Sequence, residues 1–222
     1  MKTLVIIPSR LSAQRLPGKP LMKINGISII SHVFKKAEEA NIGEVIVAAE
    51  DQEIVDDVKQ NGGQAILTKN DHKTGTDRIY EVFQKINTSD IDIIMNLQGD
   101  EPLIDTDDIR NLNEKMIKSA SKLGTLASKI QDKTLLKNSN VVKVLTKENL
   151  DETNFPEATN FTRNISEEKK NIYHHLGIYS FNKDTLEKFV SLSQSANEIK
   201  NKLEQLRALD NKIKINVAFA KF

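Results

Sequence analysis

The strongest constraint on the fold is an alternation of short apolar runs with amphipathic stretches in the first hundred residues. Strand-like runs occur at 4–7, 45–48, 65–67 and 91–97. Helical spacing of apolar residues lies between them, at 27–40, 53–59 and 76–86. The first run, Leu-Val-Ile-Ile, is apolar throughout, as expected of a strand buried on both faces of a parallel sheet. The alternation predicts a Rossmann-like α/β fold with a doubly wound, mostly parallel sheet, whose ligands bind beyond the carboxyl ends of the strands.

The second half is less regular. Its patterns predict strands at 141–145, 172–181 and 213–220 and a helix at 203–209, whereas the polar stretch 146–171 indicates no particular structure. A chain of 222 residues suits one α/β domain with a small excursion. We therefore expect a single domain over 1–222, whose nucleotide-binding half ends at about residue 105 and whose second half carries the excursion.

Composition excludes several classes of protein and of site. The formal net charge of +1 lacks the positive excess typical of nucleic-acid binders, so any anion site must be local. The absence of cysteine excludes disulfides, thiolate zinc sites and a cysteine nucleophile. The sequence has no signal-peptide pattern and no apolar run long enough to span a membrane. We expect a cytoplasmic protein with neither a membrane nor a nucleic acid as partner.

The loop after the first predicted strand concentrates positive charge. Residues 8–20 read Pro-Ser-Arg-Leu-Ser-Ala-Gln-Arg-Leu-Pro-Gly-Lys-Pro and contain Arg10, Arg15 and Lys19. Three cations at a ligand-binding end of the sheet favour a polyphosphate. The loop has one glycine, so it must rely on side-chain charge rather than on the backbone amides of a P-loop. A solvated basic loop remains the alternative.

An acidic pair follows the last of the four strand-like runs. Residues 96–103 read Asn-Leu-Gln-Gly-Asp-Glu-Pro-Leu, in which Gly99 permits a close backbone approach and Asp100 is the candidate magnesium ligand. The alternative is an ordinary turn that caps the next helix. The basic loop and the acidic pair together favour a site for magnesium and a polyphosphate.

These segments resemble the family of 3-deoxy-manno-octulosonate cytidylyltransferases, the CMP-Kdo synthetases. The resemblance extends in the family's order over nearly the whole chain, through residues 7–10, 15–21, 71–78, 98–102, 140–144, 175–179 and 203–207. It implies the nucleotide-diphospho-sugar transferase fold. It also implies transfer of CMP from CTP to 3-deoxy-D-manno-octulosonate (Kdo), with release of pyrophosphate, for the inner core of lipopolysaccharide.

The resemblance also implies roles for individual residues. Arg10, Arg15 and Lys19 would bind the triphosphate, and Asp100 would bind Mg²⁺; Arg10, Lys19 and Asp100 would form the catalytic set. The rest of the nucleotide pocket would comprise Thr68, His72, Thr74, Gly75 and Gln98. The sugar would be read by Gln98, Arg163, His175, Glu204 and Gln205. The second half would also hold the contact of a homodimer, near 141–145.

Each sugar-side assignment has a simpler alternative. His175 beside apolar neighbours could be a core histidine, and Glu204 with Arg207 could be a helix-surface pair. Rival functions are activation of another acid sugar, such as sialic acid or amino-Kdo, and nucleotide binding without catalysis.

The chain also departs from the family pattern at several places. Relatives continue into a Gly-Val-Asp-Thr turn and a final helix, and that aspartate is a second metal ligand, whereas this sequence stops at Phe222. Either a tail lies outside the sequence or the second carboxylate is missing. Smaller departures are Ala49-Glu50, Asn201 and the polar segment 153–163, which affect the fine shape of the sugar pocket.

Overall fold

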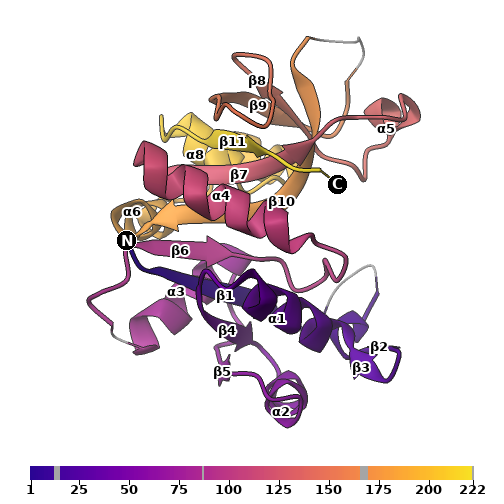
Figure 1. Cartoon of the computed structure of the whole chain (residues 1–222), viewed down its shortest axis with the longest axis vertical. Helices are drawn as coiled ribbons and strands as arrows, with labels where there is room; N and C mark the ends of the chain where they lie inside the picture. Colours follow the sequence, from indigo (N-terminus) through magenta and orange to yellow (C-terminus); the bar gives the residue numbers. More distant parts are fainter. Residues whose placement is uncertain (13–15, 87, 166–169, 222) are drawn as a thin grey trace. The chain divides into compact units, whose positions relative to one another are not determined.

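The computed structural model describes residues 1–12, 16–86, 88–165 and 170–221. It divides into two compact units, Met1–Arg110 and Asn111–Phe222, which are described in turn (Figure 1).

Parallel strands form the sheet of the first unit. They are β1 (Thr3–Ser9), β4 (Gly43–Ala49), β5 (Ala65–Leu67) and β6 (Ile93–Asn96), in the order β6-β1-β4-β5. Every residue of the central strand β1 is buried, as its unbroken apolar run predicts. The sequence alternation therefore builds the parallel sheet that it predicted.

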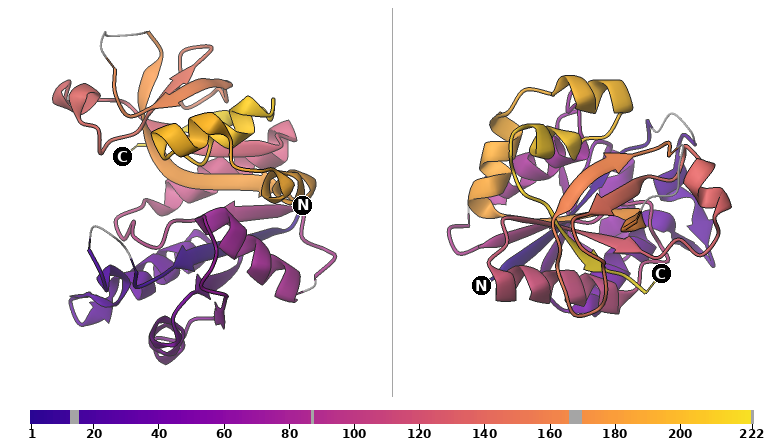
Figure 2. Two further views of the ribbon diagram at one scale, coloured as in Figure 1. Left: turned by 180° about the vertical axis from the view of Figure 1, so that it is seen from behind. Right: turned by 90° about the horizontal axis from the view of Figure 1, so that it is seen from above.

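The connections of this sheet reverse direction beside β1. The chain steps outward from β1 to β4 and β5, then returns to β6 on the other side of β1. Because parallel crossovers are right-handed, the two directions place their helices on opposite faces. Figures 1 and 2 show α1 (Ile29–Ala40) on one face and α3 (Gly75–Ile86) on the other. The reversal makes the carboxyl ends of β1 and β6 the place where a ligand is expected.

Helix α1 is fixed at both ends and along one face. Its N-cap is Ser28, whose hydroxyl oxygen accepts a hydrogen bond from the Ser31 amide, and it ends at Asn41 in the left-handed conformation at φ 52°. The carboxylate of Asp57 on α2 (Gln52–Gln60) accepts hydrogen bonds from the Ser28 and Ser31 hydroxyls. The buried face carries apolar residues at helical spacing, among them Ile30, Val33, Phe34 and Ala37.

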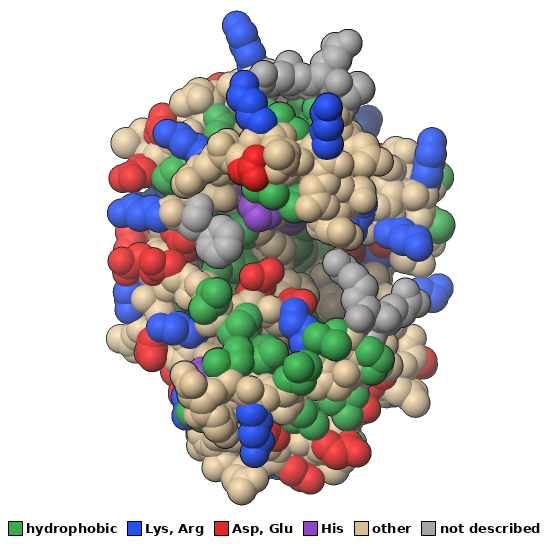
Figure 3. All heavy atoms as spheres, turned by 90° about the vertical axis from the view of Figure 1, so that its right-hand side faces the viewer, with side chains coloured by type: hydrophobic (Ala, Val, Ile, Leu, Met, Phe, Trp, Pro, Cys, Tyr) green, Lys and Arg blue, Asp and Glu red, His purple; other side chains and the backbone are tan. Residues whose placement is uncertain are grey.

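A short segment before α1 carries an exposed apolar surface. It comprises the 3₁₀ helix η1 (Lys19–Leu21) and the hairpin of β2 (Lys23–Ile24) with β3 (Ile27–Ser28). Leu16, Met22 and Ile24 are exposed there, and Figure 3 shows hydrophobic side chains gathered on this face of the first unit.

The second unit is built mainly on antiparallel strands. Strand β10 (Ile172–Asn182) pairs antiparallel with both β7 (Leu123–Ser128) and β8 (Lys143–Thr146). Strand β9 (Ala158–Thr162) adds antiparallel to β8, and β11 (Asn216–Phe219) adds parallel to β7. The sheet positions His175 and Tyr179 along β10.

Short helices complete this unit, and an ion pair joins two of them. The helices of the later chain are α4 (Thr106–Ser119), α5 (Thr134–Lys137), α6 (Lys183–Ser191), α7 (Ala196–Asn201) and α8 (Leu206–Asp210). The buried Arg207 guanidinium binds the Glu198 carboxylate at 2.6 and 2.9 Å, and thereby ties α8 to α7.

The predicted α/β class is confirmed, and the elements of the first unit follow the predicted ranges closely. The sequence patterns missed η1, β2, β3, α4, β7, α5, β9, α6 and α7, and the predicted helix at 203–209 begins three residues later, at Leu206. The prediction of a single domain over 1–222 stays a prediction. Within the described ranges, no helix is both long enough and apolar enough to cross a membrane.

Candidate active site

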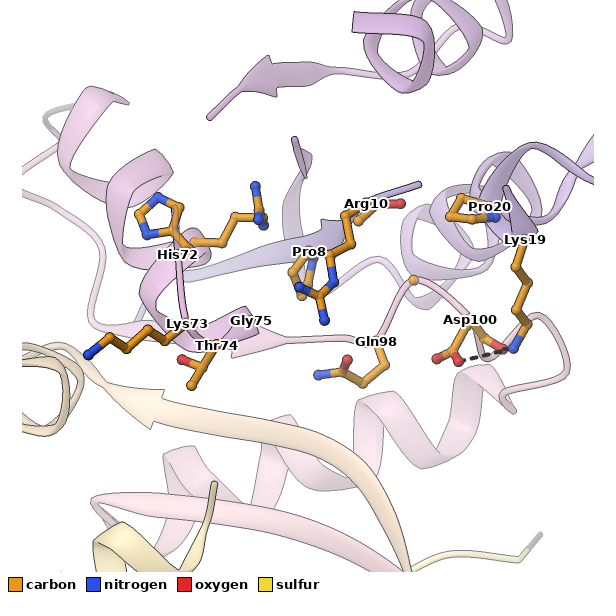
Figure 4. A pocket seen from close by; sticks show the side chains of 13 residues that line it. Pro8, Arg10, Lys19, Pro20, His72, Lys73, Thr74, Gly75, Gln98 and Asp100 are labelled. Atoms are coloured by element: carbon orange, nitrogen blue, oxygen red, sulfur yellow. Dashed lines mark hydrogen bonds and ion pairs between the residues drawn. The ribbon is translucent and has the colours of Figure 1, made fainter. Parts of the chain in front are cut away.

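A cavity of about 350 Å³ opens where the sheet of the first unit reverses direction. The loops after β1 and β6 form part of its wall, and the segment before α3 forms another part (Figure 4). The lining residues are Pro8, Ser9, Arg10, Lys19, Pro20, His72, Lys73, Thr74, Gly75, Arg78, Gln98, Gly99 and Asp100. The basic loop and the acidic pair of the sequence therefore meet in one cavity.

Positive and negative groups lie side by side at one end of this cavity. The Lys19 ammonium contacts the Asp100 carboxylate at 3.0 Å, and both side chains are partly exposed. Arg10 reaches into the cavity from the loop after β1, on the side where Gln98 lies (Figure 4). Arg15 lies outside the described residues. The arrangement can accept an anion and also offers a carboxylate to a metal ion.

Glycine at position 99 lets the loop after β6 pack closely against the end of β1 and against α1. A Cβ atom there would lie 2.9 Å from the Pro8 carbonyl oxygen and 3.0 Å from the Ile30 Cδ1 atom. Real Cβ atoms essentially never come so close to other atoms, so the approach expected from the sequence is a steric requirement. Gly99 therefore sets the spacing between the basic loop and Asp100.

Asp100 is suited to Mg²⁺ by its chemistry and exposure. Its side chain is 56% exposed, and carboxylate oxygens are the ligands that this hard cation prefers. It does not cap α4, which begins only at Thr106. No cluster of three or more metal-binding side chains occurs among the described residues. Mg²⁺ in proteins is commonly held by one or two carboxylates together with substrate phosphates and water. Loss of hydration raises the pKa of the adjacent Glu101, and the Asp100 charge raises it further.

The segment between β5 and α3 forms the wall opposite Lys19 and is anchored at its base. The buried Thr68 donates its hydroxyl to the Ala49 carbonyl at 3.0 Å and accepts from Arg78 at 2.5 Å. Thr74 accepts from the Asp77 amide at 3.2 Å and so begins α3. Of the residues expected in the nucleotide pocket, His72, Thr74 and Gly75 line the cavity, whereas Thr68 supports the segment from behind.

Apart from Gln98, which lines the cavity of the first unit, the predicted sugar-binding residues lie in the second unit. The His175 ring packs edge-on against Phe161 and beside Tyr179, and Thr125 Oγ1 lies 3.0 Å from its Nε2 atom. Burial lowers the pKa of His175 to about 3, so the ring is neutral at pH 7. Burial also raises the pKa of Tyr179, and the nearby Glu204 carboxylate raises it further. His175 and Glu204 therefore flank Tyr179.

Arg163 and Gln205 belong to the same unit. The Arg163 guanidinium donates to the backbone carbonyls of Ser139, Asn201 and Lys202 at 3.2–3.4 Å. Gln205 is buried at the start of α8. Arg207 is buried and binds the Glu198 carboxylate, so it is not part of a helix-surface pair.

Sequence reasoning did not assign several groups of the site. Arg78 lines the cavity and is held by Glu50, one of the positions where the sequence departs from the family pattern. Glu81 binds the ring of His72 from α3. A signal for Arg78 was present, since it ends the motif at residues 71–78, but nothing in the sequence pointed to Glu81.

Comparisons with known proteins agree with this geometry. The family model described as "Cytidylyltransferase" matches residues 4–215. The 3-deoxy-manno-octulosonate cytidylyltransferase of Rhodopseudomonas palustris (strain BisB18) is 43% identical over 218 residues, which cover 97% of this chain and 88% of that protein. The Brucella canis protein of the same name is 40% identical over 223 residues, which cover 100% of this chain and 88% of that one.

Solved structures of cytidylyltransferases are also similar to this chain. A CMP:2-keto-3-deoxy-manno-octonic acid synthetase complexed with CTP superposes with a TM-score of 0.87 at 35% identity, covering 99% of this chain and 90% of that one. A cytidylyltransferase from Leptospira borgpetersenii has a TM-score of 0.63 at 19% identity, covering 100% of this chain and 77% of that one, so it supports the fold alone.

Proposed function

The chain belongs to the 3-deoxy-manno-octulosonate cytidylyltransferase family, and we propose that it transfers CMP from CTP to Kdo for the inner core of lipopolysaccharide. The products are CMP-Kdo and pyrophosphate. The observation that carries the proposal is the cavity at the sheet reversal, with its cations and Asp100, in a chain that superposes over nearly its full length on a synthetase complexed with CTP.

In the reaction, the anomeric hydroxyl oxygen of Kdo attacks the α-phosphorus of CTP. The new P–O bond joins sugar to CMP, the bond from the α-phosphorus to the bridging oxygen breaks, and pyrophosphate leaves with its charge. The hydroxyl proton passes to solvent. Such transfer needs positioning and charge stabilisation more than a covalent nucleophile. Arg10 and Lys19 supply that charge, with Arg15 as a third cation, and Gln98 lies where nucleotide and sugar meet.

Asp100 would hold Mg²⁺, which neutralises charge on the phosphates when bound. The Lys19–Asp100 contact supports this assignment, because it joins a phosphate-binding cation to a metal-binding carboxylate at 3.0 Å. Removing divalent cations with EDTA and restoring Mg²⁺ tests the requirement. Unchanged turnover in EDTA would refute it.

On the sugar side, the neutral ring of His175 would exchange hydrogen bonds with hydroxyl groups rather than pair with the carboxylate of Kdo. Arg163 would bind the Kdo carboxylate, because its guanidinium is a planar bidentate donor. Glu204 and Gln205 would complete the recognition of hydroxyls.

The test is a measurement of pyrophosphate release from CTP with a panel of acid sugars. Turnover with Kdo that exceeds turnover with sialic acid or amino-Kdo supports the proposal. Turnover with sialic acid alone would identify a different sugar, and CTP binding without turnover would identify a silent homologue. A homodimer through residues 141–145, a cytoplasmic location and independence of nucleic acid stay predictions.

A further inference from the structure

The carboxylate of Glu81 gathers three donors behind the nucleotide cavity. It accepts a hydrogen bond from His72 Nε2 and one from the Lys69 amide at 3.1 Å, and it lies 2.7 Å from the Lys85 ammonium. The Glu81 side chain is 13% exposed and does not line the cavity. Its contacts therefore lie behind the wall that faces the ligand.

Glu81 is ionised at neutral pH, and this fixes the hydrogen bonding of His72. Burial by itself would raise the pKa of Glu81, but the bonds from Lys85, His72 and the Lys69 amide lower it to about 2. An ionised carboxylate only accepts hydrogen bonds, so the proton of that bond belongs to His72 Nε2. The ring of His72 is held in one orientation, with a proton on Nε2.

Two side chains of helix α3 bind the backbone of Lys69, one at its amide and one at its carbonyl. Glu81 accepts from the Lys69 amide, while Arg78, one turn earlier, donates to the Lys69 carbonyl at 3.0 Å. Arg78 also binds Thr68 and the Glu50 carboxylate. The segment that leads to the cavity residues His72 and Thr74 is thus clamped to α3 at its start.

We propose that Glu81 is a positioning residue for nucleotide binding, which acts through His72 and the Lys69 peptide without touching the substrate. The inference rests on the proposed function, because it assumes that His72 faces CTP. A wall already fixed by α3 lowers the entropy cost of binding, so the advantage should appear in nucleotide affinity. Loss of the carboxylate should weaken CTP binding and leave the chemical step nearly unchanged.

The primary test is Glu81→Gln, which keeps the shape of the side chain and removes its charge. We expect KM for CTP to rise about tenfold, the equivalent of ~1.4 kcal/mol, with kcat and KM for Kdo within about twofold of the wild-type values. A fall in kcat at unchanged KM for CTP, or no change in either, would overturn the inference.

A double-mutant cycle tests whether Glu81 acts through His72. In a His72→Ala background, Glu81→Gln should raise KM for CTP by only about twofold to threefold, because only the contacts to Lys69 and Lys85 remain to lose. Equal effects in both backgrounds would show that Glu81 acts by another route. If Glu81→Gln does not fold, His72→Gln alone must still raise KM for CTP, and a normal KM there would refute the inference.

Asp57→Asn is the matched control. Asp57 is a partly buried carboxylate of the same unit that binds the Ser28 and Ser31 hydroxyls and does not line the cavity. The control should lower thermal stability with KM for CTP unchanged; a rise equal to that of Glu81→Gln would attribute the effect to general destabilisation. The wild-type assay separates the two proposals: without turnover of CTP and Kdo the proposed function fails, whereas a normal KM for CTP in Glu81→Gln refutes only the role of Glu81.

Discussion

Replacing Gly99 by alanine tests the spacing between the basic loop and Asp100. The added methyl group would lie 2.9 Å from the Pro8 carbonyl oxygen, 3.0 Å from Ile30 Cδ1 and 3.4 Å from Ile7 Cγ2. The first of these atoms belongs to the backbone of the central strand and cannot rotate away. Insertion of a methyl group into a packed site typically costs about 1–3 kcal/mol. In a chain of this size, such a cost lowers Tm by roughly 2–12 °C, and the strain falls on the loop that carries Asp100.

The assay combines thermal unfolding with pyrophosphate release measured well below the unfolding temperature. Gly63→Ala is the matched control, because its Cβ would lie 2.8 Å from Val58 Cγ1 and 2.9 Å from Phe34 Cε1, away from the cavity. We expect both variants to lose stability and only Gly99→Ala to lose roughly tenfold or more in kcat/KM, since displacement of a catalytic group by about 1 Å is costly. Normal kcat/KM in Gly99→Ala, or equal losses in both variants, would refute the reasoning.

Three further predictions follow from the site and its charges. Asp100→Asn should leave the fold intact and cut kcat by roughly 100-fold, because a charged metal ligand becomes a neutral amide; near-normal turnover would remove Asp100 from the metal site. Arg163→Ala should raise KM for Kdo by roughly tenfold or more with KM for CTP unchanged, and a selective loss of CTP binding would show that Arg163 is misassigned. The pKa of Glu81 is lowered from 4.5 to about 2, so its contribution to stability is present above pH 4.5 and is lost as the pH falls toward 2. Urea unfolding between these pH values should show a steeper loss for wild type than for Glu81→Gln, and parallel curves would contradict the assignment.

The elements that the sequence predicted are those with a strong local pattern. Strand β1 is apolar at every position of its central run, and α1 carries apolar residues at helical spacing. Both patterns therefore identify the type of element without any tertiary information. Helix α4 was missed because acidic, basic and amide side chains separate its buried residues Ile109, Leu112 and Met116. Strand β7 was missed because Leu-Gly-Thr-Leu-Ala-Ser has only one β-branched residue, although all six positions are buried.

The parts of the site that could not be predicted depend on contacts between distant segments. Glu81 and Lys85 read from the sequence as an ordinary surface pair at i and i+4, and only the folded loop brings His72 to the same carboxylate. Arg207 lies three residues after Glu204, but its partner is Glu198 on a helix that the sequence did not indicate. Spacing along a chain therefore predicts which face a charge occupies, whereas tertiary packing decides its partner.

The charge of the cavity explains how a nearly neutral chain can bind a polyanion. In the part of the chain that the structure describes, four cations line the cavity: Arg10, Lys19, Lys73 and Arg78. Arg78 forms an ion pair with the Glu50 carboxylate, and Lys19 forms one with Asp100. Among the described residues, Arg10 and Lys73 form no ion pair, so they offer a triphosphate its first contacts. Lys19 becomes fully available only when Asp100 turns to another cation, and we therefore expect nucleotide and metal to bind more tightly together than apart.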